Sequence, residues 1–153
     1  MGIDLSKPMI DRAQRHASEN VSFVQSDILD VVQFESVGVI VCNLVLQFVP
    51  LDQREALLKQ YYDALPKGGA LIVVEKIRQA DDVMQTMYND AFYQYKRTNG
   101  YSDAEIFNKE ASLKGVLMPA TNDYYLNQFQ SLSFSLSDIF YKWYNFVGYL
   151  AIK

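Results

Sequence analysis

Short apolar runs, each bounded by polar residues, mark strands in the first half of the chain. They are expected at Met1–Asp4, Val21–Gln25, Val37–Cys42 and Ala70–Glu75. The last two runs are nearly continuous and rich in β-branched residues, which is typical of parallel strands covered on both faces. The pattern therefore predicts a sheet that is buried between helices.

Amphipathic stretches separate these strands. Ser6 is a candidate N-cap for a helix that extends to about Ala17. The pair Asp52 and Glu55 has the spacing of a capping box and predicts the start of another helix, which ends before the breaker Pro66-Lys67-Gly68-Gly69. Strands that alternate with helices through short links predict a largely parallel, doubly wound α/β sheet.

Beyond Ala80 the periodicity becomes helical. Helices are expected over about 83–99, 102–114 and 121–128. The first ends at Asn99-Gly100, which is a C-cap signal, and the second begins at the capping box Ser102-x-x-Glu105.

The tail alternates as two strands, Ser137–Trp143 and Phe146–Ile152, whose tight connection predicts antiparallel pairing. We therefore expect one domain over residues 1–153. Its parts are a cofactor-binding half at 1–79, a helical region for substrate or dimer contacts at 80–130, and the C-terminal strand pair at 131–153.

Composition narrows the functional classes. The 153 residues are 50% hydrophobic and 21% charged, with a formal net charge of −4, as in ordinary globular proteins. Lys and Arg do not cluster, so direct binding to nucleic acid is not expected. With one cysteine, Cys42, and one histidine, His16, the chain lacks the spacing of a metal site. Long apolar stretches and a signal-peptide pattern are missing, which favours a cytoplasmic protein with no membrane partner.

Polar side chains follow three of the expected strands. Asp4, Asp27 and Asn43 each come just after a carboxyl end, where ligands bind in open α/β sheets. One carboxylate can accept from two ribose hydroxyls. Asp27 could accept from an adenine amine while the Ile28 N–H meets the ring, and the Asn43 amide could hold the amino-acid or sulfonium end of a ligand. Each residue alone is also a common turn former.

A carboxylate such as Asp4 normally lies about 20 residues beyond a Gly-rich strand-to-helix turn. The sequence shows no such turn before Met1–Asp4. We therefore expect an incomplete first half-site, in either a fragment or an N-terminally shortened protein.

Several stretches resemble known families. Gly2-Ile3-Asp4, Ser26-Asp27-Ile28 and Asn43 resemble class I S-adenosylmethionine-dependent methyltransferases, which have a Rossmann-like fold. A more specific resemblance is to the carboxy-S-adenosyl-L-methionine synthase family. The stretches that carry it are Asn43–Phe48, Glu75-Lys76, Tyr95–Ser102 and Lys142–Phe146.

The resemblance implies a function. Members of this family use prephenate to carboxylate the methyl group of S-adenosylmethionine, and the product serves tRNA wobble-uridine modification. It implies S-adenosylmethionine or its carboxylated form as cofactor, prephenate as small-molecule substrate, and a homodimer. It also implies cofactor contacts at Asp4 and Leu5 (ribose), at Asp27 and Ile28 (adenine), and at Asn43 near the reacting end. No general base is identified.

The family fold also sets an expectation for the sheet. Its first strand lies between the strands that correspond here to Met1–Asp4 and Val37–Cys42. Without that strand, two backbone edges are expected to be unpaired.

Candidate substrate residues come from the helical region. Lys96 and Arg97 could complement an anionic substrate or simply compensate a helix dipole, and Tyr101 could line the site or pack in a subunit contact. Glu110 stands where the family has an arginine that grips the carboxylate of the carboxylated cofactor. Glutamate would repel that group, so the carboxylated form is expected to bind poorly unless Lys109 or Arg97 substitutes.

Three readings stay open. The first is a carboxy-S-adenosyl-L-methionine synthase-like transferase. The second is a methyltransferase with another acceptor, which Glu110 suits better, and the third is a non-catalytic scaffold. Glu75 either orders the site or pairs with Lys76, and Cys42 is expected to be an inert packed thiol.

Overall fold

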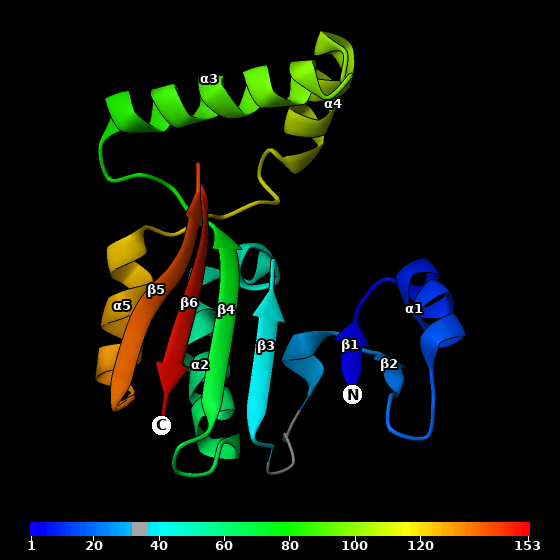
Figure 1. The fold of residues 1–153 in the computed structure, drawn as a ribbon, viewed down its shortest axis with the longest axis vertical. Helices are drawn as coiled ribbons and strands as arrows, with labels where there is room; N and C mark the ends of the chain where they lie inside the picture. The colour runs from blue at the N-terminus through cyan, green and yellow to red at the C-terminus, as the bar shows by residue number, and fades with distance from the viewer. Residues whose placement is uncertain (32–36) are drawn as a thin grey trace. The chain divides into compact units, whose positions relative to one another are not determined.

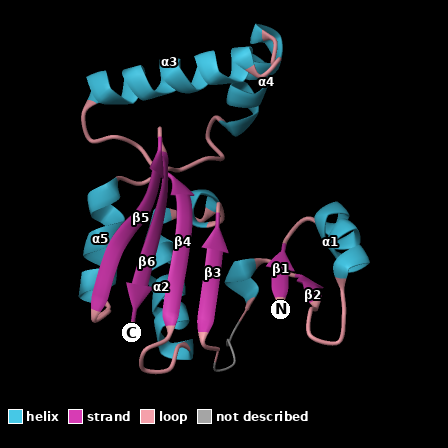
Figure 2. Cartoon of the chain, in the orientation of Figure 1, coloured by secondary structure: helices cyan, strands magenta, loops and turns pink. Residues whose placement is uncertain are grey.

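The computed structural model describes residues 1–31 and 37–153 of the chain. By their internal contacts the residues divide into two compact units, Met1–Glu35 (the first unit) and Ser36–Lys153 (the second unit). Figure 1 colours the chain from one end to the other, and Figure 2 distinguishes helices from strands. The expectation of a single domain over residues 1–153 stays a prediction.

The first unit is a strand–helix–strand element. Its parts are β1 (Gly2–Asp4), α1 (Lys7–Ala13), a 3₁₀ helix (Gln14–His16), β2 (Phe23–Gln25) and a second 3₁₀ helix (Ile28–Asp30). β1 and β2 are parallel, with Gly2 opposite Phe23. Ser6 occupies the N-cap position of α1, but its side chain makes no capping bond. The expected helix to Ala17 is thus a shorter α-helix continued by a 3₁₀ turn.

The second unit carries the larger sheet. Its elements are β3 (Val39–Asn43), a 3₁₀ helix (Leu46–Phe48), α2 (Leu51–Ala64), β4 (Ala70–Lys76), α3 (Asp82–Thr98), α4 (Asp103–Leu113), α5 (Asn122–Ser131), β5 (Leu136–Trp143) and β6 (Phe146–Ile152). The strand order is β3-β4-β6-β5. β3 and β4 are parallel, whereas β6 runs antiparallel to both β4 and β5. The α/β class and the antiparallel tail are therefore confirmed.

One face of this sheet forms the core with α2 and α5. Cys42, Val73 and Tyr149 lie in register across β3, β4 and β6. Tyr61 of α2 is hydrogen-bonded to the Cys42 thiol. The ring of Tyr125 from α5 lies 5.2 Å from that of Tyr149, centroid to centroid. Both helices therefore pack on the same face, and Cys42 is buried in it as expected.

The opposite face of β3 is open. Val39 and Val41 are 56% and 62% exposed, so the expectation of a strand covered on both faces is wrong for β3. The physical reason is that α2 and α5 of the second unit both pack on the other face, that of Cys42 and Tyr149. In the described part of the chain β3 pairs with β4 alone and β1 with β2 alone, which leaves one backbone edge of each unpaired. The two expected free edges are thus confirmed.

Helix starts in the second unit follow local chemistry. The capping box of Ser102 and Glu105 forms as predicted, and Thr121 caps α5 by accepting from the Tyr124 N–H at 3.3 Å. The capping box expected at Asp52 does not form. α2 begins instead at Leu51 directly after Pro50, whose ring fixes φ near its helical value.

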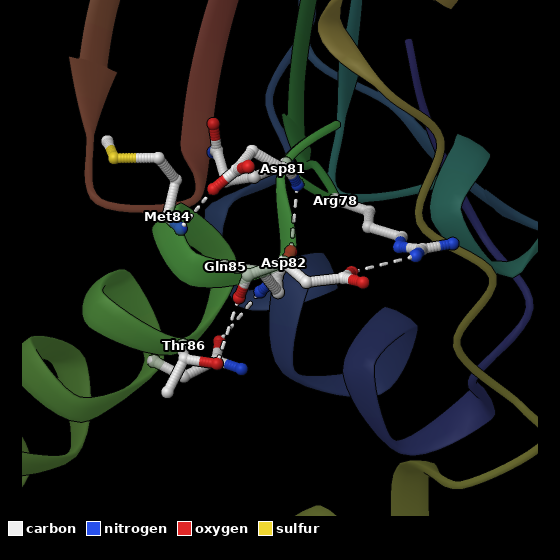
Figure 3. A network of polar contacts seen from close by, with 8 residues as sticks. Arg78, Asp81, Asp82, Met84, Gln85 and Thr86 are labelled. Atoms are coloured by element: carbon white, nitrogen blue, oxygen red, sulfur yellow. Dashed lines mark hydrogen bonds and ion pairs between the residues drawn. The ribbon is translucent and has the colours of Figure 1, made fainter.

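α3 begins in a network of polar contacts (Figure 3). Asp81 accepts a hydrogen bond from the Met84 N–H at 2.8 Å, and the Arg78 guanidinium lies 3.2 Å from the Asp82 carboxylate. The Thr86 hydroxyl donates to the Asp82 carbonyl at 2.9 Å. The Asp81 cap thus satisfies one of the free backbone N–H groups in the first turn of α3.

Aromatic packing holds α3 to the tip of the β5–β6 hairpin. The ring of Trp143 lies 4.8 Å from that of Tyr95 and 5.7 Å from that of Phe92. In Figure 1, α3 and α4 stand beyond the end of the sheet at which β3 and β4 finish. None of the described helices combines the length and apolar character needed to cross a membrane.

Candidate functional site

Asp4 and Asp27 lie at the same edge of the first unit. Asp4 ends β1 opposite Gln25, the last residue of β2, and Asp27 follows two residues later. The backbone N–H of Ser26 donates to the Asp4 carbonyl at 3.1 Å, which closes the two strand ends together. Leu5, which follows Asp4, is 65% exposed. Asp4, Leu5 and Asp27 therefore lie at one carboxyl edge of the first unit, and their role in binding a ligand stays a prediction.

Each of the two carboxylates is oriented by its own turn. Oδ1 of Asp4 accepts from the Ser6 N–H at 2.7 Å, and Oδ1 of Asp27 accepts from the Leu29 N–H at 3.0 Å. Asp27 thereby caps the 3₁₀ helix that begins at Ile28. Both are the local turns that Asp favours, so the turn-forming and ligand-binding interpretations are compatible at these positions.

Asn43 ends β3 in the second unit, opposite Val74 of β4. The next residue, Leu44, has a positive φ of 58°, and its N–H donates to the Val74 carbonyl at 2.7 Å. The chain therefore turns sharply directly after Asn43. Because Asn43 belongs to the other unit, its meeting with Asp4 and Asp27 stays a prediction.

Glu75 holds the loop that follows Asn43. Its carboxylate is fully buried and accepts hydrogen bonds from three consecutive backbone N–H groups, those of Val45 (3.0 Å), Leu46 (2.8 Å) and Gln47 (2.9 Å). Burial raises the pKa of Glu75 to about 7, and these bonds together with the nearby Arg54 guanidinium oppose the rise. Of the two interpretations of Glu75, the structure supports the ordering role. We call Glu75 and these three residues the Glu75 clamp.

The side chain of Gln47 extends the clamp to β4. Its Oε1 accepts from the backbone N–H of Lys76 at 3.1 Å, and its Nε2 donates to the Leu44 carbonyl at 3.3 Å. Its own carbonyl accepts from the Met118 N–H at 2.8 Å. The carboxyl ends of β3 and β4 are thus tied to each other and to the segment before α5.

Arg54 is a structural residue that the sequence interpretation missed. It is fully buried, its Nε donates to the Val49 carbonyl at 2.8 Å, and its Nη2 donates to the Met118 carbonyl. The signal that could have found it is its spacing. Arg54 lies three and seven residues before the buried Leu57 and Tyr61, on one face of α2.

A second group of charged residues involves β4, α3 and α4. The Tyr93 hydroxyl is hydrogen-bonded to Glu110, and the Lys96 amine lies over the rings of Phe92 (4.6 Å) and Tyr93 (5.9 Å). Burial and the nearby Lys96 charge lower the pKa of Lys76, and Glu110 acts in the opposite sense. We call Lys76, Tyr93, Lys96 and Glu110 the Lys76–Lys96 cluster.

Arg97 and Tyr101 lie outside this cluster. The Arg97 Nε is 2.7 Å from the Asp103 carboxylate in an exposed ion pair. Tyr101 is 55% exposed, and its backbone N–H donates to the Lys96 carbonyl at 3.1 Å. The structure thus brings Lys96 and Glu110 together and directs Arg97 toward the start of α4.

Known proteins resemble the chain in sequence. Residues 1–69 match the family described as "Methyltransferase domain". Over its whole length the chain is 34% identical to the carboxy-S-adenosyl-L-methionine synthase of Idiomarina loihiensis, of which it covers 65%. It is 38% identical to that of Hydrogenovibrio crunogenus, of which it covers 62%. Over its whole length the chain is therefore similar to carboxy-S-adenosyl-L-methionine synthases. It spans less than two thirds of the length of these relatives.

Solved structures agree on the fold. A SAM-dependent methyltransferase of Thermotoga maritima, described as a possible histamine N-methyltransferase, matches with a TM-score of 0.67 at 18% identity, over 99% of this chain and 72% of that one. Human N-acetylserotonin methyltransferase matches with a TM-score of 0.62 at 16% identity, over 99% of this chain and 39% of that one. The fold is therefore that of S-adenosylmethionine-dependent methyltransferases.

The stretches through which the chain resembles the carboxy-S-adenosyl-L-methionine synthase family coincide with structural features of the second unit. Asn43–Phe48 is the loop that the Glu75 clamp holds, and Glu75-Lys76 contributes to both the clamp and the Lys76–Lys96 cluster. The stretch Tyr95–Ser102 covers the end of α3 and the cap of α4. These three stretches therefore lie at or beyond the carboxyl ends of β3 and β4.

Proposed function

We propose that the protein is a carboxy-S-adenosyl-L-methionine synthase-like transferase that acts on S-adenosylmethionine and prephenate. The observation that carries the proposal is the placement of Asp4 and Asp27 at one carboxyl edge of two parallel strands. The resemblance to the carboxy-S-adenosyl-L-methionine synthase family implies these substrates. We include three further points in the same proposal. The product is used in tRNA wobble-uridine modification, the protein is cytoplasmic, and it forms a homodimer.

The carboxylates of the first unit suit the nucleoside part of the cofactor. Each aspartate uses Oδ1 for its own turn, so Oδ2 is the atom that a ligand would meet. Asp4 would accept from the ribose hydroxyls beside Leu5, and Asp27 from the adenine amine beside Ile28. Hydrogen bonds to a charged acceptor contribute about 1.5–3 kcal/mol each, which is enough for each of the two to matter for affinity.

Asn43 would meet the reacting end of the cofactor. The Glu75 clamp and the sharp turn at Leu44 fix the backbone immediately after Asn43, which orients its amide before a ligand arrives. S-adenosylmethionine supplies an activated methyl group on a sulfonium. The residues of this chain would position it and exclude water, which is how such sites lower a barrier without a dedicated base.

Glu110 favours a second candidate, a methyltransferase that uses uncarboxylated S-adenosylmethionine and another acceptor. A glutamate replaces the arginine fork that would pair with a carboxylated cofactor, and it stands beside Lys76 and Lys96. Its charge disfavours a second carboxylate at close range.

Isothermal titration separates these candidates. The chain is titrated with S-adenosylmethionine and, separately, with its carboxylated form. At least tenfold tighter binding of the carboxylated form, about 1.4 kcal/mol, supports the synthase proposal. Tighter binding of the plain cofactor supports the methyltransferase. Absence of heat with both ligands, from a sample shown to be folded by circular dichroism, overturns both proposals for this chain.

A further inference from the structure

Lys76 stands at the carboxyl end of β4 on the same sheet face as Asn43. Asn43 is in register with Val74, and Lys76 follows Val74 by two residues, so the three side chains share a face. The backbone N–H of Lys76 is held by the Gln47 side chain at 3.1 Å. The amine of Lys76 therefore projects from a fixed backbone at the edge where ligands bind in this fold.

Lys96 of α3 lies on the side of the helix that packs near Lys76. Lys76 is in register with Phe146 of β6, and the ring of Phe146 lies 5.4 Å from that of Phe92. Lys96 lies one turn after Phe92 on α3, and its amine lies over the rings of Phe92 and Tyr93. Both lysines are partly buried. Within the described ranges, neither amine comes within 4.0 Å of a carboxylate in an ion pair. Two partly desolvated like charges repel each other, and a bound anion relieves that repulsion.

Among the residues that the structure describes, Glu110 is the acidic side chain that acts on the Lys76 charge, and Glu110 also interacts with Tyr93. Ile106, one turn earlier on α4, is buried and fixes which face of the helix points inward. The Tyr93 hydroxyl is hydrogen-bonded to the Glu110 carboxylate. Burial and the Glu110 charge raise the pKa of Tyr93 to about 12, so its hydroxyl stays protonated and able to donate at neutral pH. Glu110 thus stands beside the amines without forming a close ion pair with either.

Arg97 is less well placed than Lys76 and Lys96 to bind an anion. Its guanidinium is paired with Asp103 at 2.7 Å on the surface. Using it for a ligand would require breaking that pair and turning the side chain away from α4. The cluster of Lys76 and Lys96 needs no such rearrangement.

We propose that Lys76 and Lys96 form a binding site for a ligand carboxylate, and that Glu110 sets the affinity of this site by competing for the same amines. The two amines carry two positive charges and Glu110 one negative charge, so the cluster keeps a net charge of +1 to offer an anion. This proposal rests on the proposed function, because that function supplies a substrate or cofactor with a carboxylate. It adds the residues that would bind this carboxylate.

The probe is malonate, a simple dicarboxylate, titrated into the full chain at constant ionic strength and followed by NMR chemical shifts. Lys76→Met and Lys96→Met are each expected to weaken malonate binding by about tenfold, the effect of one lost charge-assisted hydrogen bond. Lys76→Arg keeps the charge and is expected to retain binding. Glu110→Gln removes the competitor and is expected to tighten binding severalfold.

Lys114→Met is the matched control, because it removes an exposed lysine at the end of α4. Unchanged malonate affinity in this variant supports the proposal, whereas a loss equal to that of Lys76→Met overturns it by indicating a general charge effect. Unchanged or weaker binding in Glu110→Gln also overturns it. If Lys109→Met or Arg97→Met abolishes binding while Lys76→Met does not, the site lies elsewhere and the proposal fails.

The same samples are titrated with S-adenosylmethionine, which separates this proposal from the proposed function. Malonate binding that follows the expected pattern, in a chain that binds no S-adenosylmethionine, upholds the anion site and overturns the function. If the chain binds S-adenosylmethionine but Lys76→Met and Glu110→Gln leave malonate binding unchanged, the anion site is overturned and the proposed function stands.

Discussion

The backbone N–H of Leu46 donates to the carboxylate of Glu75 at 2.8 Å, and both residues are fully buried. This bond joins residues 29 positions apart and links the end of β4 to the loop after β3. The loop also contains Leu44 at φ 58°, a conformation that costs a leucine free energy. The surrounding hydrogen bonds hold that conformation, so the geometry after Asn43 depends on the Glu75 side chain.

Replacing Glu75 by alanine is therefore expected to lower the free energy of unfolding by about 3 kcal/mol or more. The variant leaves the N–H groups of Val45, Leu46 and Gln47 without their acceptor, and each unsatisfied buried group costs about 1–3 kcal/mol. Urea unfolding measures the change. Hydrogen exchange at these amides is expected to accelerate as well.

Glu55→Ala is the matched control for Glu75→Ala, because Glu55 is exposed on α2. It is expected to change the free energy of unfolding by no more than about 0.5 kcal/mol. Equal effects of the two variants would contradict the importance of the buried contacts.

The pH dependence of stability provides a second test of Glu75. Its pKa rises from 4.5 to about 7 on folding, chiefly because burial disfavours the charged form. The folded state thus binds more protons than the unfolded state between these values. The contribution of Glu75 is fully present below about pH 4.5 and is lost as the pH rises through about 7. The free energy of unfolding is expected to fall across this window by at most about 1.4 kcal/mol per pH unit.

Glu75→Gln isolates this dependence. The glutamine keeps the size of the side chain and one acceptor oxygen but does not titrate. The difference between the pH profiles of the unfolding free energy for the two proteins is expected to show the fall. A constant difference from pH about 4 to pH about 8 would contradict a raised pKa.

The sequence was sufficient to predict the elements whose signals are local. The β5–β6 pair followed from alternation with a tight connection, and the cap of α4 followed from Ser102 and Glu105. Asp4 and Asp27 were found because parallel strands end at one edge, so that any polar residue following two such strands is brought together. These inferences need no knowledge of distant contacts.

Features set by distant contacts were not predictable in the same way. The open face of Val41 depends on which strands and helices are neighbours, which β-branched composition does not report. The role of Glu75 depends on three N–H groups about 30 residues away in sequence. Likewise, the link between Tyr93 and Glu110 requires α3 and α4 to be adjacent. Periodicity in the sequence predicts which face of a helix or strand a residue occupies, but it does not predict which distant residue that side chain contacts.

Cys42 serves as a reporter of the core. The residue is 3% exposed, and burial raises the pKa of its thiol from 9.0 to about 12. Because the thiolate is the reacting form, alkylation by iodoacetamide at about pH 8 is expected to be far slower in the folded protein than in guanidinium chloride. Mass spectrometry gives the rate directly, since Cys42 is the one cysteine of the chain. Similar rates with and without denaturant would mean that the β3–α2 packing opens readily.

Arg54→Met tests whether the buried guanidinium ties the clamp to the segment before α5. Methionine fills similar space but leaves the carbonyls of Val49 and Met118 without their donor. The free energy of unfolding is expected to fall by about 2–4 kcal/mol, and the Met118 amide, bonded to the Gln47 carbonyl at 2.8 Å, is expected to exchange faster. The Arg54 charge opposes the rise in the pKa of Glu75, so its removal is expected to move the pH window of stability upward.

Arg78→Met, which breaks an exposed ion pair, controls for loss of charge and is expected to change the unfolding free energy by less than about 1 kcal/mol. An Arg54→Met protein with unchanged exchange at Met118 and an unshifted pH window would show that Arg54 is a passive filler of the core.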